Sequence, residues 1–229
     1  MKIRPIILCG GSGSRLWSNK KNFQAKQFID FGNWTLLGKT LERTKKPIFD
    51  SPIISTNLKY LKQIKIHLKK HKIKKYKIVL EPVKKNTGPA ILSAALIKDI
   101  PHNQSLLFLS ADHLIEKENV FYAEIKKNKQ HLTDKNIFIF GIKPTSPSSK
   151  YGYFTTKKNK KKIHQVLKFI EKPDQKKAKK IIKHRGYWNS GMFFLRKESI
   201  IYNFKKHQFR TYNNCLKAVA KSKYRKNTY

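Results

Sequence analysis

Short apolar runs alternate with longer amphipathic stretches along the first 141 residues. The runs are rich in Ile, Leu, Val and Phe and have the length of buried strands, and the stretches between them have helical spacing. The predicted strands are Pro5–Cys9, Pro52–Ser55, Lys77–Leu80, Ser105–Ser110 and Asn136–Gly141, and the predicted helices are Thr35–Arg43, Leu58–Lys70, Pro89–Lys98 and Val120–Leu132. This alternation predicts an α/β fold with a mainly parallel central sheet flanked by helices.

The pattern changes after Gly141. Tyr151–Thr156 and Ile163–Ile170 are predicted to pair as strands around the basic turn Lys157–Lys162. The elements expected after them are a helix at Gln175–His184, a strand at Gly191–Arg196 and helices at Glu198–Lys206 and Tyr212–Lys221. The length of 229 residues suits a single domain, 1–229, with a first portion, 1–141, and a smaller mixed β portion, 142–229, and no internal repeat is visible.

Composition favours a soluble globular protein. Hydrophobic residues make up 39% of the chain, and no segment approaches the ~18 consecutive apolar residues of a membrane-spanning helix. The apolar start, Ile3–Leu8, leads directly into glycines, so we interpret it as the buried first strand of a cytoplasmic protein and not as a signal peptide. Cys9 and Cys215 match neither a disulfide framework nor a metal-binding spacing.

The net charge of +39 taken alone suggests nucleic acid or an anionic membrane surface as a partner. However, only seven of the 52 basic residues are arginine, the residue favoured for bidentate recognition of phosphates and base edges. Lysine is spread along the chain beside abundant Ile and Asn, as an AT-rich coding sequence would produce. We therefore expect no specific nucleic-acid partner and no membrane, with a nonspecific attraction to polyanions at low salt.

A glycine-rich turn, Gly10-Gly11-Ser12-Gly13-Ser14-Arg15, follows the first predicted strand. Glycines let backbone N–H groups approach phosphate oxygens, although such a turn is often only a tight connection. The turn lacks the Gly-Lys-Ser/Thr ending of a P-loop, and Leu16 replaces the third glycine of a dinucleotide fingerprint. Two cations near it, Arg15 and Lys26, suit a triphosphate whose charge grows as pyrophosphate leaves.

Two carboxylates follow other predicted strands. Asp112 comes at the carboxyl end of the fourth strand, where α/β sheets bind ligands, and is a natural Mg²⁺ ligand. Its alternative role is a helix N-cap, and we expect His113 to be a structural neighbour. Glu81 ends the third strand and precedes Asn86 and Thr87. This set offers acceptors for guanine N1–H and N2–H₂, or else forms a capped loop.

The second portion contains three further motifs: Tyr151-Gly152-Tyr153, Phe169-Ile170-Glu171-Lys172-Pro173 and Trp188-Asn189-Ser190-Gly191-Met192-Phe193. Glu171 and Asn189 have the chemistry to bind sugar hydroxyls, and Lys172 has the charge to hold a sugar phosphate. Each of these residues is equally compatible with a turn or an edge strand.

Taken together, these motifs resemble the mannose-1-phosphate guanylyltransferase branch of the sugar nucleotidyltransferases. The matching segments are Leu8–Trp17, Lys26–Phe28, Glu81–Ala90, Ala111–His113, Gly141–Pro147, Tyr151–Tyr153, Phe169–Asp174 and Trp188–Phe193. The resemblance runs from about Ile3 to Leu195 and implies a Rossmann-like fold, with nucleotide bound by 1–141 and sugar phosphate by 142–229. It also implies transfer of GMP from GTP to mannose-1-phosphate, which gives GDP-mannose and pyrophosphate.

The resemblance assigns roles to individual residues. The residues implied to contact the triphosphate are Gly10, Gly11, Ser12, Gly13, Arg15 and Lys26. Glu81, Asn86 and Thr87 are implied to border the guanine, and Asp112 to bind Mg²⁺. Gly152, Glu171 and Asn189 are implied to hold the mannose, with Lys172 near its phosphate. No protein nucleophile is expected, because positioning and charge stabilisation suffice for an in-line displacement.

The chain departs from the family pattern at Cys9, Ser18 and Ala25, where the family usually has alanine, proline and proline. The family also continues to a second metal-binding aspartate, whereas no Asp or Glu follows Glu198 here. We therefore expect a chain that lacks the usual C-terminal part. It would work with one carboxylate, borrow one from a partner in a homo-oligomer, or be a weak or inactive relative that only binds nucleotide or polyanion. A nucleotidyltransferase for another base or hexose phosphate is the other alternative.

Overall fold

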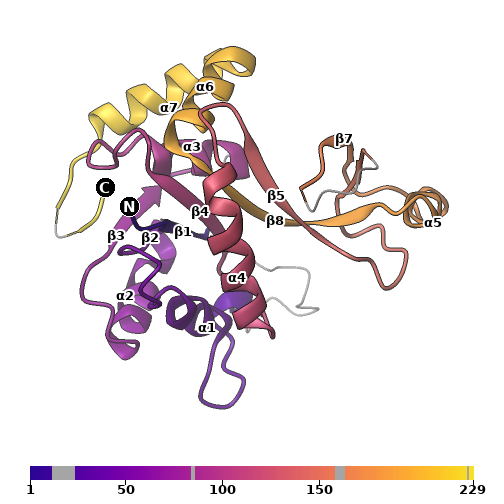
Figure 1. Ribbon diagram of the computed structural model, residues 1–229. Coiled ribbons are helices and arrows are strands. Elements are labelled where there is room, and N and C mark those ends of the chain that lie inside the picture. The colour runs from indigo at the N-terminus through magenta and orange to yellow at the C-terminus, as the bar shows by residue number, and fades with distance from the viewer. Residues whose placement is uncertain (12–23, 84–85, 158–162, 226) are drawn as a thin grey trace. The chain divides into compact units, whose positions relative to one another are not determined.

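The computed structural model describes residues 1–11, 24–83, 86–157, 163–225 and 227–229. The chain forms two compact units, which are described separately (Figure 1). The larger unit comprises Met1–Phe138 and Phe193–Tyr229, and the smaller unit comprises Ile139–Met192. The chain passes from one unit to the other within β5 (Ile137–Ile142) and returns within β8 (Tyr187–Arg196).

The larger unit is built on parallel strands in the order β3-β2-β1-β4. These strands are β1 (Arg4–Cys9), β2 (Ile53–Asn57), β3 (Lys77–Glu81) and β4 (Ser105–Ser110). The end of β8 adds to β4 in the antiparallel direction, with Phe193 opposite Phe108. Most residues of β1, β2 and β4 are buried, because both faces of the sheet are covered, as continuous apolar runs require. The prediction of a mainly parallel sheet is confirmed.

Helices cover both faces of this sheet (Figure 1). Successive residues of a strand point to opposite faces, so each strand packs against helices on both sides. Ile7 and Ile54 pack with residues of α1 (Leu36–Arg43) and α2 (Leu61–Lys70). Ile6 and Ile53 pack with residues of α3 (Thr87–Ala95) and α6 (Lys197–His207). The final helix, α7 (Phe209–Lys221), contributes Tyr212 and Cys215 to a cluster with Leu92 and Leu96.

Shorter helical segments connect these elements. A single-turn η3 (Lys26–Phe28) buries Gln27 and Phe28 and was not expected from the sequence, because three residues carry no periodicity. The predicted helix at Leu58–Lys70 begins as η4 (Leu58–Tyr60), and the helix predicted at Val120–Leu132 is α4 (Glu118–Asn128) followed by η5 (Lys129–His131). None of the helices in the described ranges is long and apolar enough to cross a membrane.

The smaller unit contains β6 (Tyr153–Thr156), which pairs antiparallel with both β7 (Val166–Ile170) and the first part of β8. Helix α5 (Gln175–Lys183) is N-capped by Asp174 and packs Ala178 and Ile181 against Tyr153. Strand β8 begins at Tyr187, four residues before the predicted Gly191, because Tyr187 and Trp188 pair with β6. The residues after Met192, which the sequence groups with the second portion, pack with the larger unit.

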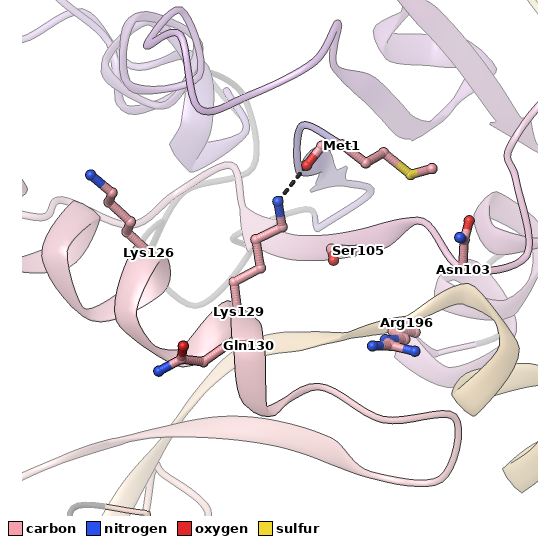
Figure 2. Close-up of a pocket in the computed structure, with 7 residues that line it drawn as sticks. All are labelled: Met1, Asn103, Ser105, Lys126, Lys129, Gln130 and Arg196. Carbon is pink, nitrogen blue, oxygen red and sulfur yellow. Dashed lines mark hydrogen bonds between the residues drawn. The ribbon is translucent and has the colours of Figure 1, made fainter.

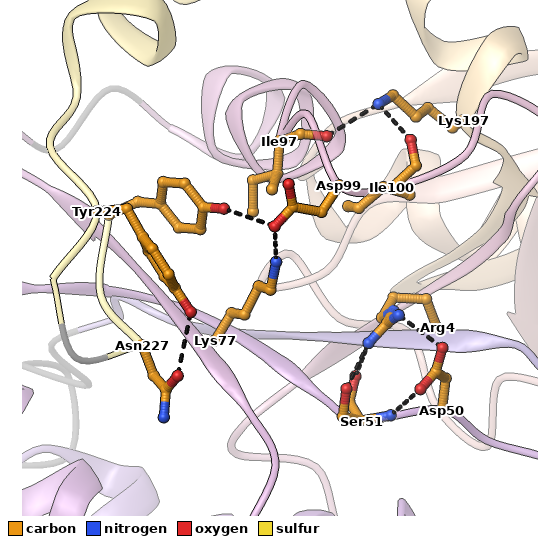
Figure 3. Close-up of polar contacts among 11 residues, drawn as sticks. Arg4, Asp50, Ser51, Lys77, Ile97, Asp99, Ile100, Lys197, Tyr224 and Asn227 are labelled. Atoms are coloured by element: carbon orange, nitrogen blue, oxygen red, sulfur yellow. Dashed lines mark hydrogen bonds and ion pairs between the residues drawn. The ribbon is translucent and has the colours of Figure 1, made fainter.

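The last residues lie along the open edge of β3. The Ile78 N–H donates to Asn227 O at 2.7 Å, and the Tyr229 N–H donates to Ile78 O at 2.8 Å. The Tyr229 hydroxyl donates to Asp99 Oδ2 at 3.1 Å. Lys77 pairs with the same carboxylate (Figure 3). No pattern in this lysine-rich stretch predicts an extra strand.

Lys197 is a buried cation at the start of α6, only 4% exposed. Its ammonium group donates to Ile97 O at 2.9 Å and to Ile100 O at 2.7 Å, just beyond the end of α3 (Figure 3). Burial lowers the pKa of Lys197 below the usual value for lysine. One side chain therefore joins α6 to the carbonyl groups that follow α3.

We predict that Lys197→Met lowers the free energy of unfolding by about 1–3 kcal/mol, because the buried carbonyls lose their donor. Urea denaturation monitored by circular dichroism measures the change. Lys217→Met, at an exposed position of α7, is the matched control and should stay within about 0.5 kcal/mol of the parent chain. Equal stability of the Lys197 and Lys217 variants would contradict a structural role for the buried ammonium.

The stability difference between the parent chain and Lys197→Met should also depend on pH. Because the pKa of Lys197 is lower in the folded chain, the unfolded chain binds more protons as the pH approaches 10.5. The stability of the parent chain should therefore rise relative to that of Lys197→Met over this alkaline range. A difference that stays constant with pH would mean that Lys197 titrates alike in both states.

Candidate active site

The carboxyl edge of the parallel strands gathers the residues that the sequence singles out in the larger unit. Gly10 and Gly11 follow β1, Glu81 is the last residue of β3, and Asp112 follows β4. Because β1 pairs in parallel with both β2 and β4, the ends of these strands lie at one edge. Such an edge is the usual ligand-binding position of open α/β sheets.

The start of the glycine turn is held by η3. The buried Gln27 side chain donates to Gly11 O at 3.1 Å. Lys26, next to it, places its ammonium nitrogen 3.7 Å from Asp112 Oδ2, and both side chains are about one third exposed. The turn and η3 thus bring a lysine and a carboxylate together beside Gly11. Ser12, Gly13 and Arg15, which complete the predicted triphosphate site, lie outside the described residues.

Cys9 precedes the turn and supplies no nucleophile. The thiol is buried, and burial raises its pKa to about 12, so it is protonated at neutral pH. Its carbonyl oxygen accepts a hydrogen bond from Thr56 Oγ1 at 3.0 Å, which joins the ends of β1 and β2. This position therefore acts as an apolar wall, as expected for a residue that replaces alanine.

Asp112 is fixed by contacts on both sides. The Ala111 N–H donates to Leu8 O at 3.1 Å, so the β1–β4 pairing extends beyond the end of β4. The Ser110 hydroxyl donates to Asp112 Oδ1. His113 Nε2 lies 4.0 Å from Oδ1, but burial lowers the pKa of His113, which favours the neutral ring. Asp112 does not cap α4, because that helix begins at Glu118 with Lys117 as its N-cap.

The donor set at Asp112 fits Mg²⁺. This ion needs only one or two protein carboxylates because it keeps waters and binds substrate phosphates. Asp112 offers a carboxylate that is about one third exposed, beside the turn expected to carry the phosphates. Within the described ranges, no group of three or more His, Cys, Asp or Glu residues is arranged to hold a metal ion.

Glu81 lies against the glycine turn. A Cβ added at Gly10 would lie 3.7 Å from Glu81 Oε1, and the Ser55 hydroxyl donates to that same oxygen at 2.7 Å. The Asn57 side chain donates to Glu81 O at 3.0 Å, which fixes the backbone. Ser55 and Asn57 were not among the predicted site residues, although polar residues at the end of a buried apolar strand are a visible signal of a binding site.

Asn86 and Thr87 lie at the amino end of α3, and both are exposed. Asn86 has a φ of 66° with a ψ of −176°, a backbone conformation that residues other than glycine rarely adopt. Its side chain makes no capping hydrogen bond to α3. The alternative interpretation, in which this segment is only a capped loop, is therefore not favoured. Residues 84 and 85, which join this pair to Glu81, lie outside the described ranges.

The smaller unit brings its four predicted residues together. The Asn189 N–H donates to Gly152 O at 2.8 Å, and a Cβ at Gly152 would lie only 2.7 Å from Glu171 Oε2. Lys172, with a φ of 42°, places its ammonium nitrogen 3.2 Å from Glu171 Oε1. The Tyr151 and Trp188 rings contact one another beside this group, with centroids 4.9 Å apart. The Glu171 carboxylate and the Lys172 ammonium group are exposed, whereas the Asn189 amide is partly exposed and its oxygen accepts from the Gly191 N–H at 3.1 Å.

A cavity of about 430 Å³, with mostly polar and charged residues in its lining, lies in the larger unit at the end of β4 opposite to Asp112. Its lining includes Ser105, the first residue of β4, and Arg196, the last residue of β8 (Figure 2). Lys129 points across it to donate to Met1 O, and Arg196 pairs with Glu198 at 3.3 Å. Because Ser105 and Asp112 are at opposite ends of β4, this cavity is separate from the candidate active site.

The α/β fold, with a glycine turn and two carboxylates at the carboxyl edge of its strands, has the layout of a nucleotidyltransferase. The model of the nucleotidyl transferase family matches residues 4–228, and the chain belongs to this family.

Among its relatives, the chain is 33% identical to the alginate biosynthesis protein AlgA of Pseudomonas fluorescens, over 95% of this chain and 46% of that protein. It is 34% identical to the mannose-1-phosphate guanylyltransferase of Salmonella montevideo, over 89% of this chain and 45% of that protein. The chain thus spans just under half the length of these curated relatives.

A solved structure supports the fold. The crystal structure of mannose-6-phosphate isomerase from Helicobacter pylori superimposes with a TM-score of 0.81 at 27% sequence identity. The match covers 96% of this chain and 80% of that chain. The predicted Rossmann-like nucleotidyltransferase fold is therefore confirmed.

Ser55 provides a test of how Glu81 is held. We predict that Ser55→Ala weakens binding of GTP about 5–30-fold while ATP binding changes little, because loss of this hydrogen bond frees the carboxylate and costs about 1–2 kcal/mol. Titration of both nucleotides measures the ratio. Ser199→Ala removes another fully buried hydroxyl, which donates to Arg196 O at 2.8 Å. This control should leave the ratio unchanged. If Ser199→Ala changed the ratio of GTP to ATP affinity to the same extent, the effect of Ser55→Ala would be due to general destabilisation.

Gly152 provides a test of the smaller unit. A methyl group at this position would displace the Glu171 carboxylate, so Gly152→Ala should raise the KM for the sugar phosphate at least ~10-fold, the loss expected for a misplaced contact. The KM for the nucleotide should stay constant. Lys168→Ala, at an exposed position of β7, is the control for this unit. An unchanged sugar-phosphate KM in Gly152→Ala would remove Glu171 from substrate binding.

Proposed function

We propose that the chain transfers GMP from GTP to mannose-1-phosphate, giving GDP-mannose and pyrophosphate, with Mg²⁺ as cofactor. The main support is the juxtaposition of Gly10, Lys26, Glu81 and Asp112 at one edge of the sheet. The name of the Salmonella relative supports the guanylyl and mannose parts of the proposal. As part of the same proposal, the chain acts in the cytoplasm on these two small molecules and has no nucleic-acid partner.

In the proposed reaction, a phosphate oxygen of mannose-1-phosphate attacks the α-phosphorus of GTP. A bond forms between that oxygen and the α-phosphorus, and the bond from the α-phosphorus to the oxygen bridging it to the β-phosphate breaks. Pyrophosphate leaves with the bridging oxygen, so no protein nucleophile is needed. The difficulty is electrostatic, because two anions must approach one another while charge builds on the leaving group.

In this proposal, the residues of the larger unit neutralise the charge of the triphosphate and recognise the base. Lys26 offers a fixed positive charge beside the glycine turn, and Asp112 would hold Mg²⁺, which supplies charge neutralisation when bound. Glu81, oriented by Ser55, would accept hydrogen bonds from guanine N1–H and N2–H₂. A base without those donors would leave the carboxylate unpaired, at a cost of about 1–3 kcal/mol, which gives the proposed base selectivity. Asn86 and Thr87 would border the base, and Ser12, Gly13 and Arg15 are proposed to complete the triphosphate site.

The residues of the smaller unit are proposed to hold the acceptor. Glu171 and Asn189 would bind mannose hydroxyls, and the main chain at Gly152 would approach the sugar closely. Lys172 would pair with the sugar phosphate. Before the sugar phosphate binds, the contact with Glu171 orients the ammonium group of Lys172. The left-handed backbone of Lys172 is a strained conformation of the kind found at binding sites.

Pyrophosphate release from GTP and mannose-1-phosphate in the presence of Mg²⁺ tests the proposal. We predict that Asp112→Asn lowers kcat at least ~10²-fold, the scale of losing one stabilising group, while the fold is retained because the amide can still accept from Ser110. Asp134→Asn makes the same charge change at an exposed position and should be fully active. Parent-like activity of Asp112→Asn would remove Asp112 from the mechanism. A panel with ATP, UTP, CTP and glucose-1-phosphate tests the substrate assignment, and equal rates would overturn it.

A further inference from the structure

The cavity of about 430 Å³ at the start of β4 takes no part in the proposed reaction. Ser105 and Arg196, which line it, are direct partners in the antiparallel β4–β8 ladder, so their side chains leave the same face of the sheet. In Figure 2, Lys129 lies between this pair on one side and Lys126 and Gln130 on the other. A molecule held here would therefore contact donors from the sheet and from the helical segments α4 and η5.

The lining carries positive charge. Its charged side chains are Lys126, Lys129 and Arg196, and no Asp or Glu is among the described residues that line it. The carbonyl end of α4 has a partial negative charge, which Lys126 and Lys127 in the last turn offset. Glu198, outside the lining, pairs with Arg196 Nη1 at 3.3 Å. One neighbouring carboxylate does not balance the cations of the lining, so the cavity attracts an anion.

Several donors in the lining have no protein partner. The guanidinium group of arginine has five N–H donors, and only Nη1 of Arg196 contacts a carboxylate within the described ranges. The Ser105 hydroxyl, in a residue only 8% exposed, and the Lys126 ammonium group form no hydrogen bond with any described residue. These unused donors match the oxygens of a phosphate group, which a guanidinium binds through two parallel hydrogen bonds.

Charge alone does not distinguish this place, because the whole chain has a net charge of +39. A lysine on an open helix face, such as Lys127, is solvated on its own and holds no ligand in position. The cavity instead gathers its donors around one enclosed volume, in which the aliphatic stems of the lysines supply apolar walls. Its volume is in the range of small-molecule sites, which leaves room for a small body attached to the phosphate.

We propose that this cavity binds a phosphate group, either inorganic phosphate or that of a small phosphate ester, through Arg196, Ser105 and Lys129. Because Ser105 and Asp112 are at opposite ends of β4, this phosphate site is distinct from the proposed triphosphate site. The inference does not depend on which nucleotide or sugar phosphate the chain uses.

Amide NMR titration of the full chain with inorganic phosphate, at physiological ionic strength, tests the proposal. The Ser105 amide signal reports this cavity, and the Gly11 signal reports the candidate active site. Arg196→Gln should weaken phosphate binding at Ser105 at least ~10-fold, because a charge-assisted bidentate contact is lost. Arg210→Gln, at an exposed position of α7, is the matched control and should bind as the parent chain does.

A second pair of variants keeps the test independent of the fold of Arg196→Gln, and thermal melts check that each variant is folded. Lys129→Gln should weaken phosphate at Ser105, whereas Lys127→Gln, which is outside the lining, should not. Glycerol phosphate distinguishes the two sources of the phosphate group. Tighter binding than that of inorganic phosphate indicates a phosphate ester as the occupant, and weaker binding indicates the free ion.

Two results would overturn the proposal. If the Ser105 signal did not respond to either compound, the cavity would take no phosphate. If Arg196→Gln and Arg210→Gln weakened binding equally, the chain would attract phosphate only through its overall charge, which salt screens.

Discussion

The parallel pairing of β1 with β4 is the interaction on which the candidate active site depends. It continues past the regular strands through the hydrogen bond from the Ala111 N–H to Leu8 O. This contact carries Asp112 to the glycine turn, where η3 supplies Lys26. The pairing of β2 with both β1 and β3 brings Ser55 and Glu81 to the same edge. Residues that are more than 100 positions apart in the chain therefore share one electrostatic environment.

Most of the architecture was predictable from the sequence because buried strands and amphipathic helices have distinct periods. The strands of the larger unit were predicted to within a residue or two. The η3 turn and the pairing of Asn227–Tyr229 with β3 were not predicted, since a single turn and an isolated bridge leave no periodic signal. At the site, the position of a carboxylate after a strand predicted Asp112 and Glu81. Ser55 was visible as a polar residue at the end of a buried strand, but its contact with Glu81 depends on strand order, which a sequence pattern does not contain.

Carboxylates are scarce in this chain, with 13 acidic residues against 52 basic ones, and several of them lie next to a lysine. Asp112 is close to Lys26, Glu171 to Lys172, and Asp99 to Lys77. Exposed pairs of this kind contribute little to stability because water and salt screen them. At the two proposed substrate sites the pairs would have a further role: Lys26 and Lys172 would keep the carboxylates in place, and both groups of each pair could exchange that contact for one with a substrate.

The pairing of Asn227–Tyr229 with β3 has a consequence for how the larger unit folds. It joins the last residues of the chain to β3, about 150 positions earlier, and Asp99 adds a second link through Tyr229. Contacts between such distant positions form late in folding, because a long loop must close before they contribute. They also cover part of an edge that would otherwise present unpaired N–H and C=O groups to other chains. The tail therefore protects the finished sheet from association but leaves that edge open while the chain is still folding.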